Sequence, residues 1–223
     1  MSLFSALPDD PSLSDPLPTS PLPLLGRWMQ EACDGRVQRN PTAMTLATVG
    51  EDGDLSARVV LWRRYDEESG FLVFHTNRES RKGEALAERP EAALVMHWDA
   101  LQRQVRIEGP VTVSPDAESD DYWETRDRAA QIAAAVSAQS RLIRSRDDLL
   151  QRLRAEEERY GGEEGPPVPR PPHWGGYRVW CRHVELWVGA EGRAHDRVLW
   201  SRALEASGDS FHAADWSRMR LQP

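Results

Sequence analysis

The spacing of apolar residues predicts that most of the chain forms β-strands. Short segments of alternating apolar or β-branched residues are separated by turn residues, a pattern typical of successive strands. Segments 43–49 and 57–65 flank the turn residues 50–54, which predicts a hairpin. Further strands are expected at 71–76, 92–98, 103–113, 176–182, 184–188 and 197–201. Their mostly consecutive order favours an antiparallel barrel, a mainly β fold with peripheral helices in the α+β class.

Helical spacing is confined to a few segments. Apolar residues recur at three- and four-residue intervals over 24–33, which predicts an amphipathic helix packed on the body. Ser80 is placed to cap a helix over 80–89, and Pro90 would end it. Segment 116–159 is expected to be helical in two or three pieces.

The domain organisation follows from length and proline content. Residues 1–23 are rich in proline and aspartate, which predicts a disordered N-terminal tail. The chain has 223 residues, long for one domain and short for two, so residues 24–223 are expected to form one domain. That domain would include the helical insert 116–159 and a proline-rich connector, 161–172.

Composition excludes several classes of function. The net charge of −8 disfavours a nucleic-acid partner. No apolar run approaches the roughly 18 residues of a membrane span, and the start lacks a basic segment followed by an apolar one, so a cytoplasmic protein is expected. Cys33 and Cys181 are too few for a disulfide framework, and the histidines lack metal-ligand spacing, so no metal is expected. The glycine-rich loops of nucleotide-binding folds are also absent from the sequence.

The sharpest local feature is segment 76–82, Thr-Asn-Arg-Glu-Ser-Arg-Lys, where a strand end runs into a helix start. Free amides, the positive end of the helix and the adjacent Arg81 and Lys82 suit a phosphate group. A solvated basic helix start explains this segment equally well when it is considered alone.

Two other places suggest anion binding. By the two-residue period of a strand, Arg58 and Arg63 point to opposite faces, and each needs a carboxylate, solvent or a phosphate. Tyr122 and Arg126 lie four residues apart on the helix expected over 116–127, with Ala130 next if that helix continues. A tyrosine packed on an arginine stem is the simpler interpretation of that pair.

A third group of candidates lies near the C-terminus. Strand alternation leaves Trp187 on the outer face, which suits an interface or a flat ligand. Arg193, His195 and Arg197 follow at every second residue, so they would project from one side of an extended segment. A solvated edge strand is the alternative.

These features occur in an order that resembles the pyridoxine/pyridoxamine 5'-phosphate oxidase family over residues 24–223. The matching segments are Asn40-Pro41-Thr42-Ala43-Met44, Arg58-Val59-Val60-Leu61, Thr76-Asn77, Ser80-Arg81-Lys82, Arg103-Gln104-Val105, Gln131-Ile132, Val136-Ser137, Gln139-Ser140, Trp174-Gly175-Gly176-Tyr177-Arg178, Glu185-Leu186-Trp187, Arg193, His195-Asp196-Arg197 and Arg220-Leu221-Gln222-Pro223.

The resemblance implies an FMN-binding split β-barrel that forms a homodimer, with FMN at the subunit interface. It implies oxidation of a small phosphorylated pyridine, pyridoxamine or pyridoxine 5'-phosphate, to pyridoxal 5'-phosphate, with O2 as acceptor and H2O2 as product. By the same resemblance Arg193 and His195 are catalytic and face the substrate ring, and three residues hold its phosphate: Arg63, Tyr122 and Arg126. The implied FMN-binding residues are Arg58, Val59, Val60, Leu61, His75, Thr76, Arg81, Lys82, Gln104, Gln139, Ser140, Trp187 and Arg197.

Three positions depart from the family pattern: Arg63 replaces a usual Lys, Ala130 an expected phosphate-contacting Ser, and His75 a usual Tyr. Loss of the Ser favours an alternative, a flavin oxidase of the same fold that acts on another substrate such as a phenazine-biosynthesis intermediate. A flavin or pyridoxal-phosphate carrier is a further alternative, which the presence of Arg193 and His195 disfavours. A barrel without any ligand is the last.

Overall fold

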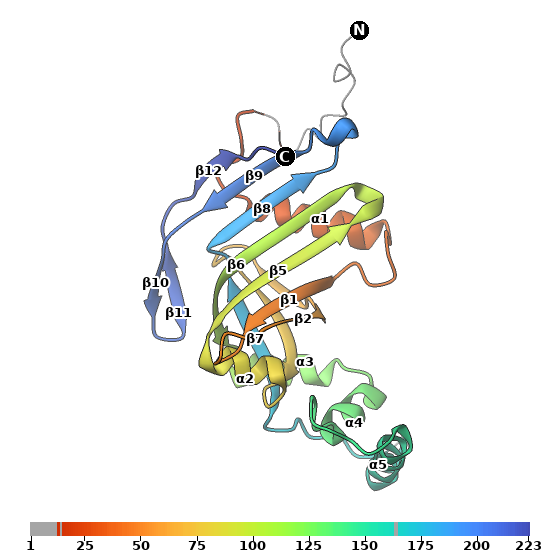
Figure 1. Cartoon of the computed structure of the whole chain (residues 1–223). Coiled ribbons are helices and arrows are strands. Elements are labelled where there is room, and N and C mark those ends of the chain that lie inside the picture. The colour runs from red at the N-terminus through yellow and green to blue at the C-terminus, as the bar shows by residue number, and fades with distance from the viewer. Residues whose placement is uncertain (1–12, 14, 163–164) are drawn as a thin grey trace.

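The computed structural model describes Leu13, residues 15–162 and residues 165–223. Among these residues, ten strands form one antiparallel sheet, so the predicted mainly β fold with peripheral helices is confirmed (Figure 1). The strands of the chain, of which β10 and β11 form a separate two-stranded pair, are β1 (Ala43–Val49), β2 (Leu55–Leu61), β3 (Arg64–Asp66), β4 (Phe71–Asn77), β5 (Glu91–Trp98), β6 (Arg103–Val113), β7 (Trp174–Trp180), β8 (His183–Val188), β9 (Asp196–Ser201), β10 (Leu204–Ser207), β11 (Ser210–Ala213) and β12 (Ser217–Arg220). The α-helices are α1 (Leu22–Asp34), α2 (Arg81–Glu88), α3 (Asp116–Glu124), α4 (Arg128–Val136) and α5 (Arg146–Arg159).

Strand β6 joins the two parts of the sheet. Most of its length pairs with β5 and β8, whereas Val111–Val113 pair with β7, which in turn pairs with β4. The chain bends between these two pairings at Gly109, where a Cβ atom would lie 1.8 Å from the carbonyl oxygen of Trp180. Only glycine permits this close backbone approach, which curves the sheet toward a half-barrel.

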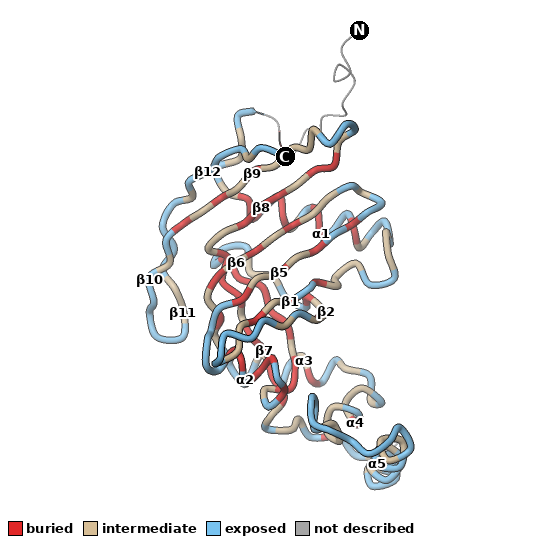
Figure 2. The backbone as a smooth tube through the Cα atoms, viewed as in Figure 1, coloured by how far each residue is buried: buried red, intermediate tan, exposed pale blue. Residues whose placement is uncertain are grey.

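The core lies between α1 and the inner face of the sheet. Leu25 and Trp28 of α1 are fully buried in one apolar cluster with Leu46, Leu94 and Val105 of the sheet. Figure 2 shows burial concentrated in α1 and the central strands, whereas α5 is largely exposed. The body therefore has a single main core. Among the described helices, none has the length and apolar character needed to cross a membrane.

The N-terminal segment differs from the prediction. Residues 1–12 and 14 of the predicted disordered tail lie outside the described residues, but the rest of that tail packs on the body. Leu13 is buried, its carbonyl accepts from Arg220, and the Pro18 carbonyl accepts from the Trp200 indole at 3.0 Å. Helix α1 also begins at Leu22, before the predicted residue 24. Prolines prevent regular structure here, but not the burial of the leucines between them.

The helical insert has the predicted number of pieces, but its first helix is shorter than expected. Helix α3 ends at Glu124 and Thr125 is its C-terminal cap, so Tyr122 and Arg126 do not share one helix face. Helices α4 and α5 of the insert project away from the sheet in Figure 1, whereas α3 packs on β7. Strands β10, β11 and β12 were absent from the prediction, because they are only four residues long and mostly exposed and so carry little hydrophobic pattern.

Candidate functional site

A cavity of about 330 Å³ opens where β2, β4, α2 and α3 meet. The described residues that line it include four cationic side chains and no carboxylate. Such a lining attracts anions, because clustered cations without carboxylate partners raise the local positive potential. Its lining is Arg58, Val59, Val60, Leu61, Arg63, His75, Thr76, Lys82, Tyr122, Arg126 and Gln139, all of them among the residues singled out in the sequence.

The start of α2 supplies the first cationic group. Ser80 is the predicted N-cap, its hydroxyl accepting from the Gly83 amide at 3.4 Å. Gly83 allows the tight entry, because a Cβ there would lie 2.0 Å from the Arg78 carbonyl oxygen. Lys82 Nζ donates to Thr76 Oγ1 at 2.9 Å, Ser80 Oγ at 3.0 Å and Gln139 Oε1 at 2.5 Å. Burial, and then the nearby Arg58, lower the pKa of Lys82 to about 8.

Arg58 supplies a second cation from β2. Its guanidinium donates to the Leu46 carbonyl at 3.1 Å and to Thr48 Oγ1 at 2.9 Å, both on the neighbouring strand. Burial and then the positive charge of Arg81 lower the pKa of Arg58. Arg81 itself lines a neighbouring hollow, with its side chain mostly exposed and 4.0 Å from Asp54.

The opposite end of the cavity is aromatic. The His75 ring stacks on Tyr122 with centroids 4.2 Å apart and lies 5.2 Å from the Trp174 ring. Arg63 sits over Tyr122 at 5.5 Å, and Arg126 over Trp174 at 4.9 Å. Burial, followed by Arg126 and Arg63, lowers the pKa of His75 to about 4, so its imidazole is neutral at physiological pH.

Arg58 and Arg63 were expected to point to opposite faces of one strand, yet both line this cavity. Alternation along β2 places Arg58 and the buried Val60 on one side and the exposed Val59 on the other. The strand ends at Leu61, however, and β3 begins at Arg64. The two-residue period therefore does not extend to Arg63.

A second hollow of about 380 Å³ continues behind the first and shares His75, Thr76, Arg126 and Gln139 with it. Its far side is formed by small and aromatic groups: Ala130, Ala133, Ala134 and Trp174.

Asn77, which also lines this hollow, was not predicted as a site residue. Its amide donates to the Ser137 carbonyl at 3.1 Å and so ties the loop that carries Gln139 to β4. Ser140, next along that loop, is exposed and has a φ of +72°, a left-handed conformation that non-glycine residues rarely adopt.

The remaining candidates form a separate group on the sheet. Gln104, Trp187 and Arg197 are direct cross-strand neighbours on β6, β8 and β9, so their side chains share one face. None of the three lines the cationic cavity. Sequence reasoning placed these residues but could not show that they lie apart from the cavity.

His195 lies beside this group, and contrary to the expectation Arg193 and His195 do not lie on one extended segment. Glu191–Arg193 forms a short 3-10 turn, and β9 begins only at Asp196. The His195 ring lies 4.7 Å from that of Trp187, and its Nδ1 accepts from the Ala190 amide at 3.1 Å. Neutral His195 therefore carries its proton on Nε2.

Glu185 is a charged residue of this face that was not recognised as important. It is buried, with Oε2 accepting from Arg106 at 2.9 Å and Oε1 from Arg197 Nε at 2.9 Å. Arg197 also donates from Nη1 to the Gln222 carbonyl at 3.0 Å, and the Glu185 hydrogen bond is the main cause of its raised pKa. Glu185 shares a face with Trp187, so alternation predicted exposure, and only the two arginines explain its burial.

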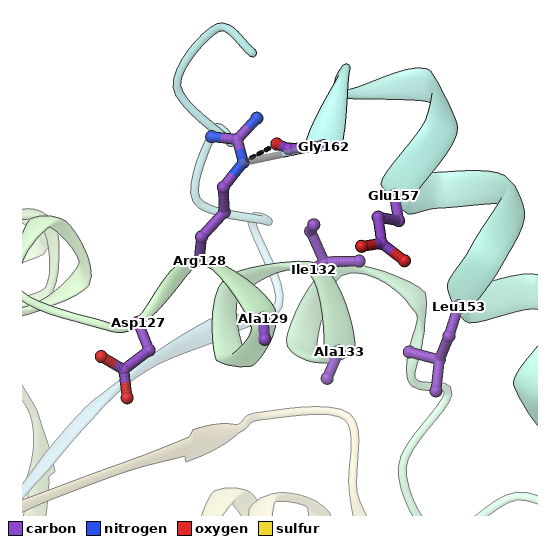
Figure 3. A pocket seen from close by; sticks show the side chains of 8 residues that line it. All are labelled: Asp127, Arg128, Ala129, Ile132, Ala133, Leu153, Glu157 and Gly162. Atoms are coloured by element: carbon purple, nitrogen blue, oxygen red, sulfur yellow. Dashed lines mark hydrogen bonds between the residues drawn. The ribbon is translucent and has the colours of Figure 1, made fainter. Parts of the chain in front are cut away.

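A cavity of about 580 Å³ lies between α4 and α5 and has a different character (Figure 3). Ile132, Ala133 and Leu153 give it an apolar wall, and Arg128 turns toward the connector, donating to the Gly162 carbonyl. No predicted site residue lines it. Across the described part of the chain, no group of three or more His, Cys, Asp or Glu side chains is arranged to hold a metal ion.

Comparison with known families gives two matches that together span most of the chain. Residues 29–160 match the pyridoxamine 5'-phosphate oxidase family, and residues 174–223 match the pyridoxine 5'-phosphate oxidase C-terminal dimerisation region. The second match contains Trp187, Arg193, His195 and Arg197.

Individual relatives agree. A pyridoxine/pyridoxamine 5'-phosphate oxidase of Acaryochloris marina is 45% identical over 88% of this chain and 83% of its own. A pyridoxine/pyridoxamine 5'-phosphate oxidase of Burkholderia ambifaria is 47% identical over 91% of this chain and 89% of its own. Among solved structures, PhzG from Burkholderia lata, in complex with tetrahydrophenazine-1-carboxylic acid, superposes with a TM-score of 0.81 at 30% identity, covering 96% of both chains. A pyridoxamine 5'-phosphate oxidase-related, FMN-binding protein of Nostoc punctiforme has the same fold at 17% identity and a TM-score of 0.69, over 90% and 98% of the two chains. The chain therefore belongs to the pyridoxamine 5'-phosphate oxidase family.

Proposed function

We propose that this protein is an FMN-dependent oxidase that converts pyridoxamine or pyridoxine 5'-phosphate to pyridoxal 5'-phosphate, reducing O2 to H2O2. The observation that carries the proposal is the cavity in which Arg58, Lys82, Arg63 and Arg126 meet without a carboxylate. Its size and charge suit phosphorylated ligands, and the identity to curated oxidases of this name supports the choice of substrate.

The donor set of the cavity fits the phosphate of FMN. Lys82, Arg58 and Thr76 offer hydrogen bonds beside the N-terminus of α2, where free amides and the helix dipole favour an anion. Gln139 reaches the same place, since it already accepts from Lys82. Bound FMN would supply the hydride acceptor for the oxidation.

The flavin ring would rest on the face formed by Gln104, Trp187 and Arg197. Because these residues lie outside the cavity of their own chain, we assign them to the site of a second copy, so that each site draws on both subunits. The matched dimerisation region contains Trp187 and Arg197, which supports a homodimer. In this arrangement Arg197 would offset negative charge that develops on the reduced ring.

The substrate would bind at the aromatic end of the cavity. Arg63 and Arg126 would hold its phosphate, with Tyr122 between them and the neutral His75 behind. Arg193 and His195, of which His195 adjoins Trp187, would face the pyridine ring, and Nε2–H of His195 would donate to it. These residues orient two flat rings against each other, and no side-chain nucleophile is required.

The proposal is tested by mixing the FMN-loaded protein with pyridoxamine or pyridoxine 5'-phosphate in air. We expect pyridoxal 5'-phosphate and peroxide in equal amounts, and bleaching of the flavin absorbance when O2 is excluded. Flavin that stays oxidised with both substrates under anaerobic conditions would rule the function out.

A second candidate, oxidation of a tricyclic phenazine precursor, is favoured by the alanine-lined side of the second hollow. Ala130, Ala133 and Ala134 leave room beside Arg126 where a serine hydroxyl is expected in the family. The 30% identical PhzG structure contains a reduced phenazine carboxylic acid. Anaerobic flavin reduction by such a compound, together with inert pyridoxine 5'-phosphate, would favour this candidate.

A further inference from the structure

Lys82 is the only lysine of the chain. Its amine is therefore the only side-chain amine in the sequence, and Lys82 lines the cationic cavity. Arg58, Arg63 and Arg126 line the same cavity and would hold a phosphate group beside that amine. The cavity thus places a nucleophile next to an anion-binding site.

The surroundings of Lys82 tolerate the neutral amine as well as the ammonium. Its partners are two hydroxyl groups, Thr76 and Ser80, and the carboxamide of Gln139. Hydroxyl groups accept or donate, and a carboxamide can turn to present its NH2 group. No carboxylate of the described residues pairs with the amine, and its lowered pKa, about 8, leaves a substantial neutral fraction in mildly basic solution.

We propose that the flavin-free protein captures a phosphorylated aldehyde in this cavity as an imine with Lys82. The neutral Nζ adds to the aldehyde carbon, the carbonyl oxygen leaves as water, and a carbon–nitrogen double bond links ligand and protein. No oxidant or reductant is consumed. The arginines hold the phosphate and raise the local concentration of the aldehyde.

The inference rests on the proposed function, because pyridoxal 5'-phosphate, the product proposed above, is an aldehyde of this class. FMN would use Lys82 for its own phosphate, so the imine and FMN exclude each other. Accumulated product would therefore slow the loading of flavin into newly made protein.

The test uses the full-length flavin-free protein, pyridoxal 5'-phosphate and borohydride, which reduces an imine to a stable secondary amine. Peptide mass spectrometry then locates the label at either amine of the chain, Lys82 or the N-terminus. We expect saturable labelling of Lys82, suppressed by prior addition of FMN. Pyridoxal, which has no phosphate, should need a roughly 10-fold higher concentration for half-maximal labelling of Lys82, since it lacks charge-assisted hydrogen bonds to the arginines.

The matched control is Lys82→Arg, which keeps the cation but forms no imine under these conditions. FMN binding to this variant, measured by quenching of flavin fluorescence, confirms that its site is folded, and its label should fall only at the N-terminus. Wild-type label confined to the N-terminus, or label at Lys82 that FMN does not suppress, would overturn the proposal. Saturable labelling of Lys82 together with an FMN-loaded protein that oxidises neither substrate would uphold the capture and refute the oxidase.

Discussion

Replacing Glu185 with glutamine should lower the free energy of unfolding and also loosen the hold on the Arg197 side chain. The buried carboxylate accepts hydrogen bonds from Arg106 and Arg197, each at 2.9 Å, and its side chain is 5% exposed. Glu185→Gln keeps the shape and removes the charge that both arginines face. We expect a loss of about 1.5–3 kcal/mol in the free energy of unfolding, the range for hydrogen bonds to charged groups.

Glu108→Gln is the matched control, because Glu108 accepts from the same Arg106 but is 40% exposed. An exposed pair contributes only about 0–1 kcal/mol. Urea unfolding of the flavin-free protein at one fixed concentration measures both variants, because the stability of a dimer depends on concentration. In an Arg197→Met background, the loss in the free energy of unfolding caused by Glu185→Gln should be smaller by at least about 0.5 kcal/mol. Equal losses for the two glutamine variants, or no coupling to Arg197, would refute this role of Glu185.

Three further predictions concern the cavity. Lys82→Met should weaken FMN binding by about 10- to 100-fold in fluorescence titrations, because one charge-assisted phosphate contact is lost. An unchanged dissociation constant would show that Lys82 does not contact the phosphate. Ala130→Ser should lower the KM for pyridoxine 5'-phosphate by up to about 10-fold with little change in kcat, since it adds a hydroxyl beside Arg126; an unchanged KM would argue that the substrate phosphate lies elsewhere. His75→Phe should flatten the acid side of the stability curve in urea unfolding. Burial is the main cause that lowers the pKa of His75 to about 4. Between about pH 4 and 6.5 the unfolded chain therefore binds a proton that the folded chain does not, so the free energy of unfolding falls as the pH falls through that window. Equal pH slopes for wild type and His75→Phe would contradict this.

Most of the strand framework was predictable from local pattern. The hairpin of β1 and β2, the long β6 and the Ser80 cap of α2 follow from alternation, turn residues and capping chemistry. Each of these signals acts within about ten residues of sequence. Prediction failed where the signal was weak, as in the short exposed strands β10–β12, or where burial came from distant partners, as for Leu13 beside Arg220.

The candidate site was predictable as a set of residues but not as an arrangement. The resemblance to a family identified both the cavity residues and the Gln104–Trp187–Arg197 row, whereas only the fold shows that the two groups lie apart. Glu185 was missed because a single carboxylate in a strand predicts exposure, and its two arginine partners come from β6 and β9. Such pairings depend on strand order, which local sequence does not encode.

The arginines of this chain are held in two different ways, with carboxylate partners or without them. The pKa values of Arg170 and Arg220 are raised above the usual range, chiefly by the hydrogen bonds that these arginines donate to Asp120 and Asp196.

In the cavity the pKa shifts have the opposite direction. Burial, together with neighbouring cations, lowers the pKa values of Arg58, Lys82 and Arg126. The described residues that line the cavity include no carboxylate to relieve the repulsion between these cations, although acidic residues outnumber basic ones in the chain by 36 to 28. A bound phosphate would offset this repulsion, so part of the affinity for FMN and substrate comes from charges that folding has already brought together.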